Sequence, residues 1–235
     1  MKPEDVVSLC AQNNALWCDA VLKAAGAQTG YHHGYWQALG ATVPLFPNIV
    51  TVTDDHGADL TSALAVLPAN AAVKDSFNCL NLRSLGFEEL LTGTWLFRMP
   101  QSSRKPPAPP SWHKAVTVES LRKWLEGWSD KEVLHKIFPA KLLEVQAIDF
   151  ASILQDSTLK AGAALNHGPA CDGKNIIGVS NVFRRKSWLF GALHDLLEPY
   201  PHRPVCTYET DDELLPVYRQ LGFEEVGKLT VWRKL

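Results

Sequence analysis

The sequence predicts an α/β (α+β) fold in which helices flank a sheet, and three observations support this prediction. Helix-like and strand-like apolar patterns follow one another along the chain from residue 112 onward. Residues 118–128 carry a clear amphipathic helix pattern, and three runs within residues 147–183 have the character of consecutive strands. A proline-rich segment separates this part from the first hundred residues, so we expect two folded parts.

Length and composition place the chain among ordinary globular proteins. It has 235 residues, of which 46% are hydrophobic and 20% charged, and it can bury one large core or two smaller ones. A net charge of -2 and a pI near 6.4 argue against a nucleic-acid partner or an anionic membrane partner. No long apolar run follows the acidic start, so we predict neither a signal peptide nor a membrane span.

The cysteines and histidines indicate neither a disulfide framework nor a metal site. The five cysteines are odd in number, scattered and free of Cys-x-x-Cys spacing, which is typical of reduced thiols and predicts a cytoplasmic protein. His32 and His33 could suggest a metal site, but adjacent residues point apart and no Cys or carboxylate is close in sequence. We therefore favour a packed aromatic loop there.

The first part of the chain, residues 1–99, is predicted to contain helix and strand. The pattern favours a helix over about residues 4–25 and strands over residues 49–53, 72–77 and 90–97. Tyr31–Trp36 is aromatic and punctuated by glycine, and we expect a loop or a short helix there. Residues 100–111 carry five prolines and should form a stiff, extended linker.

The second part, residues 112–235, contains more elements in a definite order. The predicted order is a strand (112–116), two helices (118–128 and 131–143), three strands (147–154, 159–166 and 175–183), a helix (188–198), a strand (204–208), a helix ending at Gly222, and two short strands separated by a turn at residues 226–228. We expect these elements to form one complete domain.

A short segment occurs twice in the chain. The sequence of residues 83–89, RSLGFEE, matches that of residues 219–225, RQLGFEE, at six of seven positions. Such a recurrence of sequence indicates an internal repeat. It predicts one full structural unit and one shortened relative of it.

The arrangement Tyr218-x-x-Leu221-Gly222-Phe223 resembles the last helix and strands of the GNAT acyltransferase superfamily. The element order of residues 112–235 is also similar to that of a complete GNAT domain. This resemblance implies a mixed, mostly antiparallel central sheet flanked by helices, with a smaller GNAT-like lobe formed by residues 1–99.

The resemblance also implies acetyl-CoA as a co-substrate. In that family the fourth strand presents a backbone amide to the thioester carbonyl, and residues 176–183 resemble this strand. The following loop and helix start bind the pyrophosphate. Carried over by position, the cofactor-binding residues are Val182, Phe183, Arg184, Arg185, Lys186, Ser187, Gly191 and Asp211.

The loop departs from the family pattern Gln/Arg-x-x-Gly-x-Gly/Ala. In the nearest register Lys186 comes first, Leu189 stands at the middle glycine and Gly191 at the last position. The side chain of Leu189 lies where the backbone must approach phosphate closely. The adjacent cations Arg184, Arg185 and Lys186 could offset this loss by contacting phosphate directly.

Two catalytic roles follow from the resemblance. Tyr218 occupies the position of a tyrosine that protonates the leaving CoA thiolate, although a core position in the apolar stripe explains it equally well. For the base that accepts the amine proton we choose Glu209, with Asp149 or a water near Ser180 or Asn181 as alternatives. An acidic helix start explains Glu209 equally well.

The leading hypothesis is an N-acyltransferase, which moves an acetyl group from acetyl-CoA to a primary amine of a small molecule or peptide. Direct attack in a ternary complex is expected, because no cysteine or serine has a recognisable nucleophile setting. One alternative is a non-catalytic GNAT-like binding module with a degenerate CoA loop. Another is a tandem GNAT-like transferase that uses aminoacyl-tRNA, which requires a basic groove that the net charge does not favour.

Overall fold

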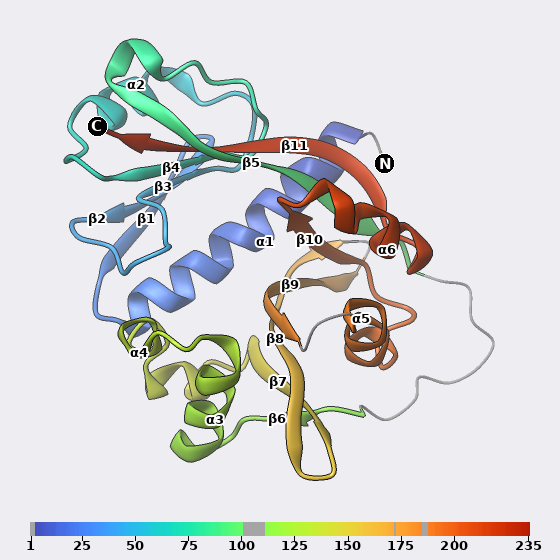
Figure 1. Cartoon of the computed structure of the whole chain (residues 1–235). Helices are drawn as coiled ribbons and strands as arrows, with labels where there is room; N and C mark the ends of the chain where they lie inside the picture. The colour runs from blue at the N-terminus through green and yellow to red at the C-terminus, as the bar shows by residue number, and fades with distance from the viewer. Residues whose placement is uncertain (1–2, 101–110, 172, 185–187) are drawn as a thin grey trace. The chain divides into compact units, whose positions relative to one another are not determined.

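The computed structural model in Figure 1 describes residues 3–100, 111–171, 173–184 and 188–235. The chain divides into two compact units. Unit 1 combines the chain up to Leu96 with Tyr208–Asp212 and Glu225–Leu235, and unit 2 combines Phe97–Thr207 with Glu213–Glu224. Residues 101–110 of the predicted linker lie outside the described residues.

Unit 1 contains helices, a 3-10 turn and six strands. These are α1 (Pro3–Ala24), α2 (Gly57–Ala65), η1 (Arg83–Leu85), β1 (Gln28–His32), β2 (Tyr35–Leu39), β3 (Ile49–Thr51), β4 (Ala72–Asp75), β5 (Phe87–Arg98, which continues into unit 2) and β11 (Glu224–Lys234). The strand order is β1-β2-β3-β4-β11-β5. The pair β3–β4 is parallel, whereas β1–β2, β2–β3 and β4–β11 are antiparallel.

Helices lie on both faces of the unit 1 strands, and two neighbouring residues of β2 show this. Tyr35 joins a buried cluster with Leu60 of α2 and Trp232 of β11. Trp36 is fully buried on the other face, where its Nε1 donates to the carboxylate of Asp19 in α1 at 3.0 Å. The long helix α1, blue in Figure 1, contacts β1, β2 and β3. The alternation of a strand thus gives unit 1 two cores.

The expectation of a loop or short helix at Tyr31–Trp36 is wrong, because this segment forms the β1–β2 hairpin. Gly34 allows the turn, since its φ of 79° lies in the left-handed region. A Cβ at this position would lie 2.2 Å from the backbone oxygen of Asp55. His32 stacks on Tyr35 with ring centroids 4.8 Å apart. Within the described part of the chain, no group of three or more His, Cys, Asp or Glu side chains could hold a metal.

Unit 2 contains five strands and the remaining helices. These are β6 (His113–Lys114), α3 (Val118–Trp128), α4 (Glu132–His135), η2 (Ala140–Glu144), β7 (Ile148–Gln155), β8 (Thr158–Cys171), β9 (Lys174–Arg184), α5 (Leu189–Leu197), β10 (Val205–Glu209, which continues into unit 1) and α6 (Leu215–Gln220, preceded by η3, Asp212–Leu214). The strand order is β10-β9-β8-β7-β6. Only the β9–β10 pair is parallel among these neighbours.

The core of unit 2 is built around Trp124 of α3. A capping box formed by Thr117 and Ser120 begins this helix. The Trp124 ring is fully buried and meets the rings of Phe138, Phe150 and Phe183 edge-on, at centroid distances of 5.9, 4.9 and 5.2 Å. Its Nε1 donates to the carbonyl of Ala151 at 3.0 Å. Helix α3 is thereby fixed against β7, β8 and β9.

The two copies of the repeated segment have the same local geometry. Gly86 and Gly222 have φ angles of 80° and 83°, and each ends a short helical segment and precedes a buried phenylalanine. The turn predicted at residues 226–228 is wrong, because β11 runs unbroken from Glu224 to Lys234. A Cβ at Gly227 would lie 2.9 Å from Cγ2 of Val7. This glycine therefore permits close approach of α1 and does not mark a turn.

The predicted fold class is confirmed. In both units most strand pairs are antiparallel, and helices pack against the strands. The helix over residues 4–25 and the three consecutive strands of residues 147–183 are also present. Among the described residues, no helix combines the length and the apolar character needed to cross a membrane.

Candidate active site

The strands β9 and β10 of unit 2 separate after a short parallel pairing. Their register includes only Val205 with Ile177 and Cys206 with Gly178. At the next step the hydroxyl of Thr207 donates to the carbonyl of Val179 at 2.9 Å. A side chain thus makes this contact, and no strand pairing of β9 with β10 follows it. Parallel strands that part in this way expose backbone groups along their edges.

Strand β9 also bulges where it leaves β10. Ala164 pairs with Ser180 but Gly162 pairs with Phe183, so two residues of β9, Asn181 and Val182, face one residue of β8. Asn181 has a φ of 53°, in the left-handed region that Asn tolerates better than most residues. A bulge leaves one residue out of the ladder and re-aims its backbone. The backbone of Asn181–Val182 therefore departs from regular pairing with β8.

Side chains of the predicted cofactor-binding residues on β9 have different surroundings. The ring of Phe183 packs on Trp124, and an added Cβ at Gly127 or Gly162 would lie 2.8 or 2.5 Å from it. Phe183 can therefore offer a ligand its backbone but not its ring. Val182 and Arg184 flank it in the strand, and alternation directs their side chains away from the α3 core.

The start of α5 lies four residues beyond β9. Arg185, Lys186 and Ser187 lie outside the described residues. Trp188 is the N-cap, and its side chain caps no backbone N–H of the first turn. A Cβ at Gly191 would lie 2.2 Å from Nε1 of Trp188, so the glycine makes room for this indole. The first turn of α5, which the Trp188 side chain does not cap, is the part of the described segment suited to an anion.

Tyr218 belongs to the same unit. It lies on α6, which packs against α5, and only 2% of it is exposed. Its ring meets that of Phe223 edge-on, with centroids 5.6 Å apart. The guanidinium of the buried Arg98 lies 5.8 Å from the centroid of the same Phe223 ring, and burial lowers the pKa of Arg98. This cluster combines a phenol and a cation in a largely apolar setting.

Glu209 and Asp211 belong to unit 1. The Oε1 atom of Glu209 accepts hydrogen bonds from the backbone N–H groups of Thr210 at 2.8 Å and Asp211 at 3.0 Å. The carboxylate thus shapes the turn that follows β10. Val182, Phe183, Arg184, Gly191 and Tyr218 thus belong to unit 2, whereas Glu209 and Asp211 belong to unit 1.

A second group of charges in unit 2 surrounds Asp149, the alternative base. Its carboxylate contacts Nζ of Lys114 at 2.5 Å and Nε2 of His167 at 2.9 Å. Arg203 donates to Nδ1 of His167 at 3.1 Å and twice to the carbonyl of Asn175. Since a guanidinium has only donors, Nδ1 of His167 must accept, and its Nε2 is the donor to Asp149. These contacts engage the Asp149 carboxylate in ion pairing and hydrogen bonding, which favours a structural role for it.

We expect Asp149→Asn to destabilise the protein by about 1–2 kcal/mol at neutral pH. Burial works to raise the pKa of Asp149, but hydrogen bonds from His167 and Lys114 outweigh it, and the pKa is lowered. A lowered carboxyl pKa stabilises the fold above the unfolded value near 4, and this stability disappears as the pH falls through the folded value. Urea unfolding from pH 7 to pH 3 should show the difference between variant and parent shrinking on acidification.

Asp195→Asn is the matched control for this prediction. Asp195 is more exposed, and its carboxylate contacts the neighbouring His194 at 3.3 Å. Its loss should change the free energy of unfolding by less than about 0.5 kcal/mol. Equal effects of the two substitutions at every pH would contradict the role assigned to Asp149.

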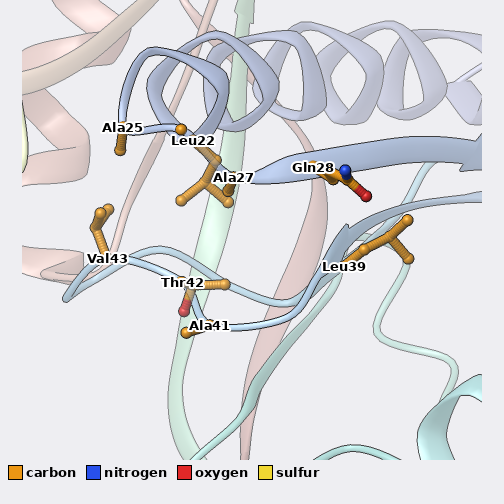
Figure 2. A pocket seen from close by; sticks show the side chains of 9 residues that line it. Leu22, Ala25, Ala27, Gln28, Leu39, Ala41, Thr42 and Val43 are labelled. Atoms are coloured by element: carbon orange, nitrogen blue, oxygen red, sulfur yellow. The ribbon is translucent and has the colours of Figure 1, made fainter.

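A cavity of about 360 Å³ in unit 1 is not a candidate site. Figure 2 shows its two sides. One side is formed by Leu22 at the end of α1 and Gln28 at the start of β1, and the other by the chain at Leu39–Val43. Its lining consists of apolar side chains, a glycine, Gln28 and Thr42, none of which titrates. It offers no acid, base or nucleophile.

The sequence interpretation missed three structural features of the candidate site in unit 2. The bulge at Asn181, the Thr207 hydroxyl at the point of separation and the buried Arg98 were not singled out. Asn after Ser180 in an otherwise apolar strand was a usable signal, because Asn is among the residues that accept a left-handed backbone. Neither Thr207 nor Arg98 stands out by spacing or pattern.

The element order, the parallel β9–β10 pair that separates and the bulge in β9 define a GNAT-type fold. No protein-family model matches the sequence, and no curated protein is similar to it in sequence. Comparison with solved structures supports this description of the fold.

Three solved structures show the likeness. A protein assigned to the GNAT acetyltransferase family from Novosphingobium aromaticivorans has a TM-score of 0.57 at 12% identity, over 93% of this chain and 96% of that one. A GCN5-related N-acetyltransferase from Kribbella flavida has a TM-score of 0.57 at 18% identity, over 94% and 95%. An N-myristoyltransferase from Saccharomyces cerevisiae has a TM-score of 0.50 at 10% identity, over 85% and 61%. At these identities the likeness shows the fold alone, and the chain has the GNAT fold.

Proposed function

We propose that this protein is an N-acyltransferase that moves an acyl group from acyl-CoA to a primary amine of a small molecule or peptide. The observation that carries the proposal is the separation of β9 from β10 beside the Asn181–Val182 bulge, in a chain with the GNAT fold. The bulge supplies a backbone N–H that no strand ladder uses.

In this mechanism a backbone N–H of Asn181–Val182 donates to the thioester carbonyl. Negative charge develops on that oxygen when the amine attacks, and a donor already aimed at it stabilises the transition state. The first turn of α5 and the side chain of Arg184 hold the pyrophosphate, because both present donors or positive charge to an anion. The sequence adds Arg185, Lys186 and Ser187 to this group.

Two proton transfers accompany the step. The amine attacks the thioester carbon, the C–S bond breaks, and the thiolate of CoA leaves with a proton from the Tyr218 hydroxyl. The proton lost by the amine passes to a base. The sequence candidate for this base, Glu209, belongs to unit 1, where its carboxylate accepts hydrogen bonds from two backbone N–H groups. Direct attack requires no covalent acyl-enzyme, since amine and thioester are held together.

The length of the acyl group is a separate part of the proposal. Acetyl-CoA is the donor expected from the sequence resemblance. One of the similar structures is an N-myristoyltransferase with bound myristoyl-CoA, which shows that the fold also serves long acyl chains in that protein. The experiment below therefore compares both donors.

Isothermal titration of the full chain with acetyl-CoA and with myristoyl-CoA tests the proposal. We expect one of them to bind with a dissociation constant in the range of about 1 μM to 1 mM. Arg184→Ala should weaken that binding about tenfold, because it removes a charge-assisted contact to phosphate. Arg122→Ala, which removes an exposed arginine from α3 in the same unit, is the matched control.

Absence of binding by both donors at millimolar concentration would refute the proposal. Binding without release of free CoA thiol in the presence of primary amines would instead favour the non-catalytic binding module. The specific observation behind that second candidate is the indole of Trp188, which packs against Gly191 at the last position of the family pattern.

A further inference from the structure

Unit 1 has a second cavity, and none of its lining residues takes part in the proposed transferase mechanism. Its volume is about 450 Å³, and it lies among the loop of residues 42–47 and strands β4, β5, β10 and β11. All of its lining residues belong to unit 1. A cationic side chain, Lys74, and the phenol of Tyr208 line it together with several leucines.

Lys74 is a buried cation with neutral partners. Only 6% of this residue is exposed. Its Nζ donates to Oδ1 of Asn14 at 3.0 Å and to the hydroxyl of Tyr208 at 3.3 Å, and it lies 4.4 Å from the centroid of the Tyr208 ring. No ion pair found among the described residues involves Lys74.

A buried ammonium without an opposite charge is costly, because it loses its water and gains no ion pair. The group has three donor hydrogens, and its two hydrogen-bond acceptors are an amide oxygen and a phenol oxygen. One donor is left for another partner, and the Tyr208 ring face offsets the positive charge only in part, because it carries no formal opposite charge. An anionic group that enters the cavity would supply both an acceptor and the opposite charge.

The other cation at this cavity is already neutralised. Arg233 lines the cavity, and its guanidinium pairs with Glu88, with Nε at 3.0 Å from Oε1. Lys74 is therefore the uncompensated charge of the lining. A ligand with a single negative charge matches it.

The remaining walls are apolar and include exposed leucines. Leu45, Leu90 and Leu91 line the cavity with exposed fractions of 71%, 50% and 38%. Leu45 also has a φ of 68°, a backbone conformation that is unfavourable for leucine. Exposed apolar surface around one buried charge is the pattern of a site for an amphipathic small molecule.

We propose that this cavity binds a small monocarboxylate with an apolar body, such as a medium-chain fatty acid. The carboxylate accepts a hydrogen bond from Nζ of Lys74, and the hydrocarbon body covers Leu45, Leu90 and Leu91. This site goes beyond the proposed function and does not depend on it, because its residues hold the ligand without acyl-CoA.

Isothermal titration of the full chain with sodium octanoate, below its micellar concentration and without any CoA compound, tests the site. We expect one molecule to bind per chain. The uncharged 1-octanol should bind at least about tenfold more weakly, because it cannot replace the ionic hydrogen bond to Lys74.

Variants locate the binding. Lys74→Met keeps an unbranched side chain, one atom shorter, but removes its charge, and it should weaken octanoate binding about 10- to 100-fold. Lys228→Met makes the same chemical change outside the cavity, where Nζ contacts Thr94 and Asp212, and it should leave binding unchanged. Leu45→Asn suits the left-handed backbone and should weaken binding about fivefold by removing apolar contact.

Three results would overturn the proposal. They are no binding of octanoate at millimolar concentration, equal binding of octanoate and 1-octanol, and equal loss of binding in Lys74→Met and Lys228→Met. If Lys74→Met does not fold, unchanged octanoate binding by Leu45→Asn overturns it as well. Failure of acyl-CoA binding leaves these measurements unaffected, so the two proposals fail separately.

Discussion

Trp124→Ala is expected to lower the free energy of unfolding by about 3–5 kcal/mol. The fully buried indole is in ring contact with Phe138, Phe150 and Phe183 and donates to the carbonyl of Ala151. Its removal leaves a cavity between α3 and the strands, and it leaves a buried carbonyl without this donor. Urea unfolding followed by far-UV circular dichroism measures the loss.

Trp124→Phe is the control for this large effect. It keeps an aromatic ring among the three phenylalanines but removes the hydrogen bond to Ala151, and it should cost about 1–2 kcal/mol. A loss below about 1 kcal/mol for Trp124→Ala would mean that the core of unit 2 does not depend on this residue.

Tyr218→Phe is expected to reduce kcat of acyl transfer by about 100-fold or more, with a small change in KM for the acyl donor. The substitution removes one hydroxyl, and with it the proton that the leaving thiolate takes in the proposed mechanism. The ring still packs on Phe223, so the variant should remain folded. A continuous assay of free CoA thiol measures kcat and KM.

Tyr200→Phe provides a matched control for that prediction. Tyr200 lies in the same unit, its ring meets His167 edge-on, and burial raises its pKa to about 12. Loss of its hydroxyl should leave kcat unchanged. Full activity of Tyr218→Phe would remove the acid role of Tyr218, whereas the acyl-CoA site could still stand.

Elements with a single strong period were predictable from the sequence. Helix α3 has an unambiguous apolar stripe between Thr117 and Trp128, and β7, β8 and β9 are apolar runs separated by turn residues. The β1–β2 hairpin was missed because His33 in the turn looked like part of an aromatic run. The glycine at 34 was the informative residue, since the turn requires a left-handed backbone.

Contacts between segments distant in sequence could not be predicted. A single glycine in a strand-like sequence can mark either a turn or a place where another segment approaches closely. Gly227 was interpreted as a turn, and only the position of Val7 on α1 shows that it permits close approach. The buried position of Lys74 could not be predicted for the same reason, since its partners Asn14 and Tyr208 come from distant parts of the chain. For the candidate site, pattern predicted β9 and α5, but the bulge at Asn181 depends on pairing with β8.

The position of β11 in unit 1 has a consequence for biosynthesis. This strand lies between β4 and β5, yet more than a hundred residues separate it from β5 in the sequence. While the ribosome is still making the intervening residues, β4 and β5 have unpaired edges that can join other nascent chains. Unit 1 therefore completes its folding only after unit 2 has been translated, and a chaperone that shields strand edges would act in that interval.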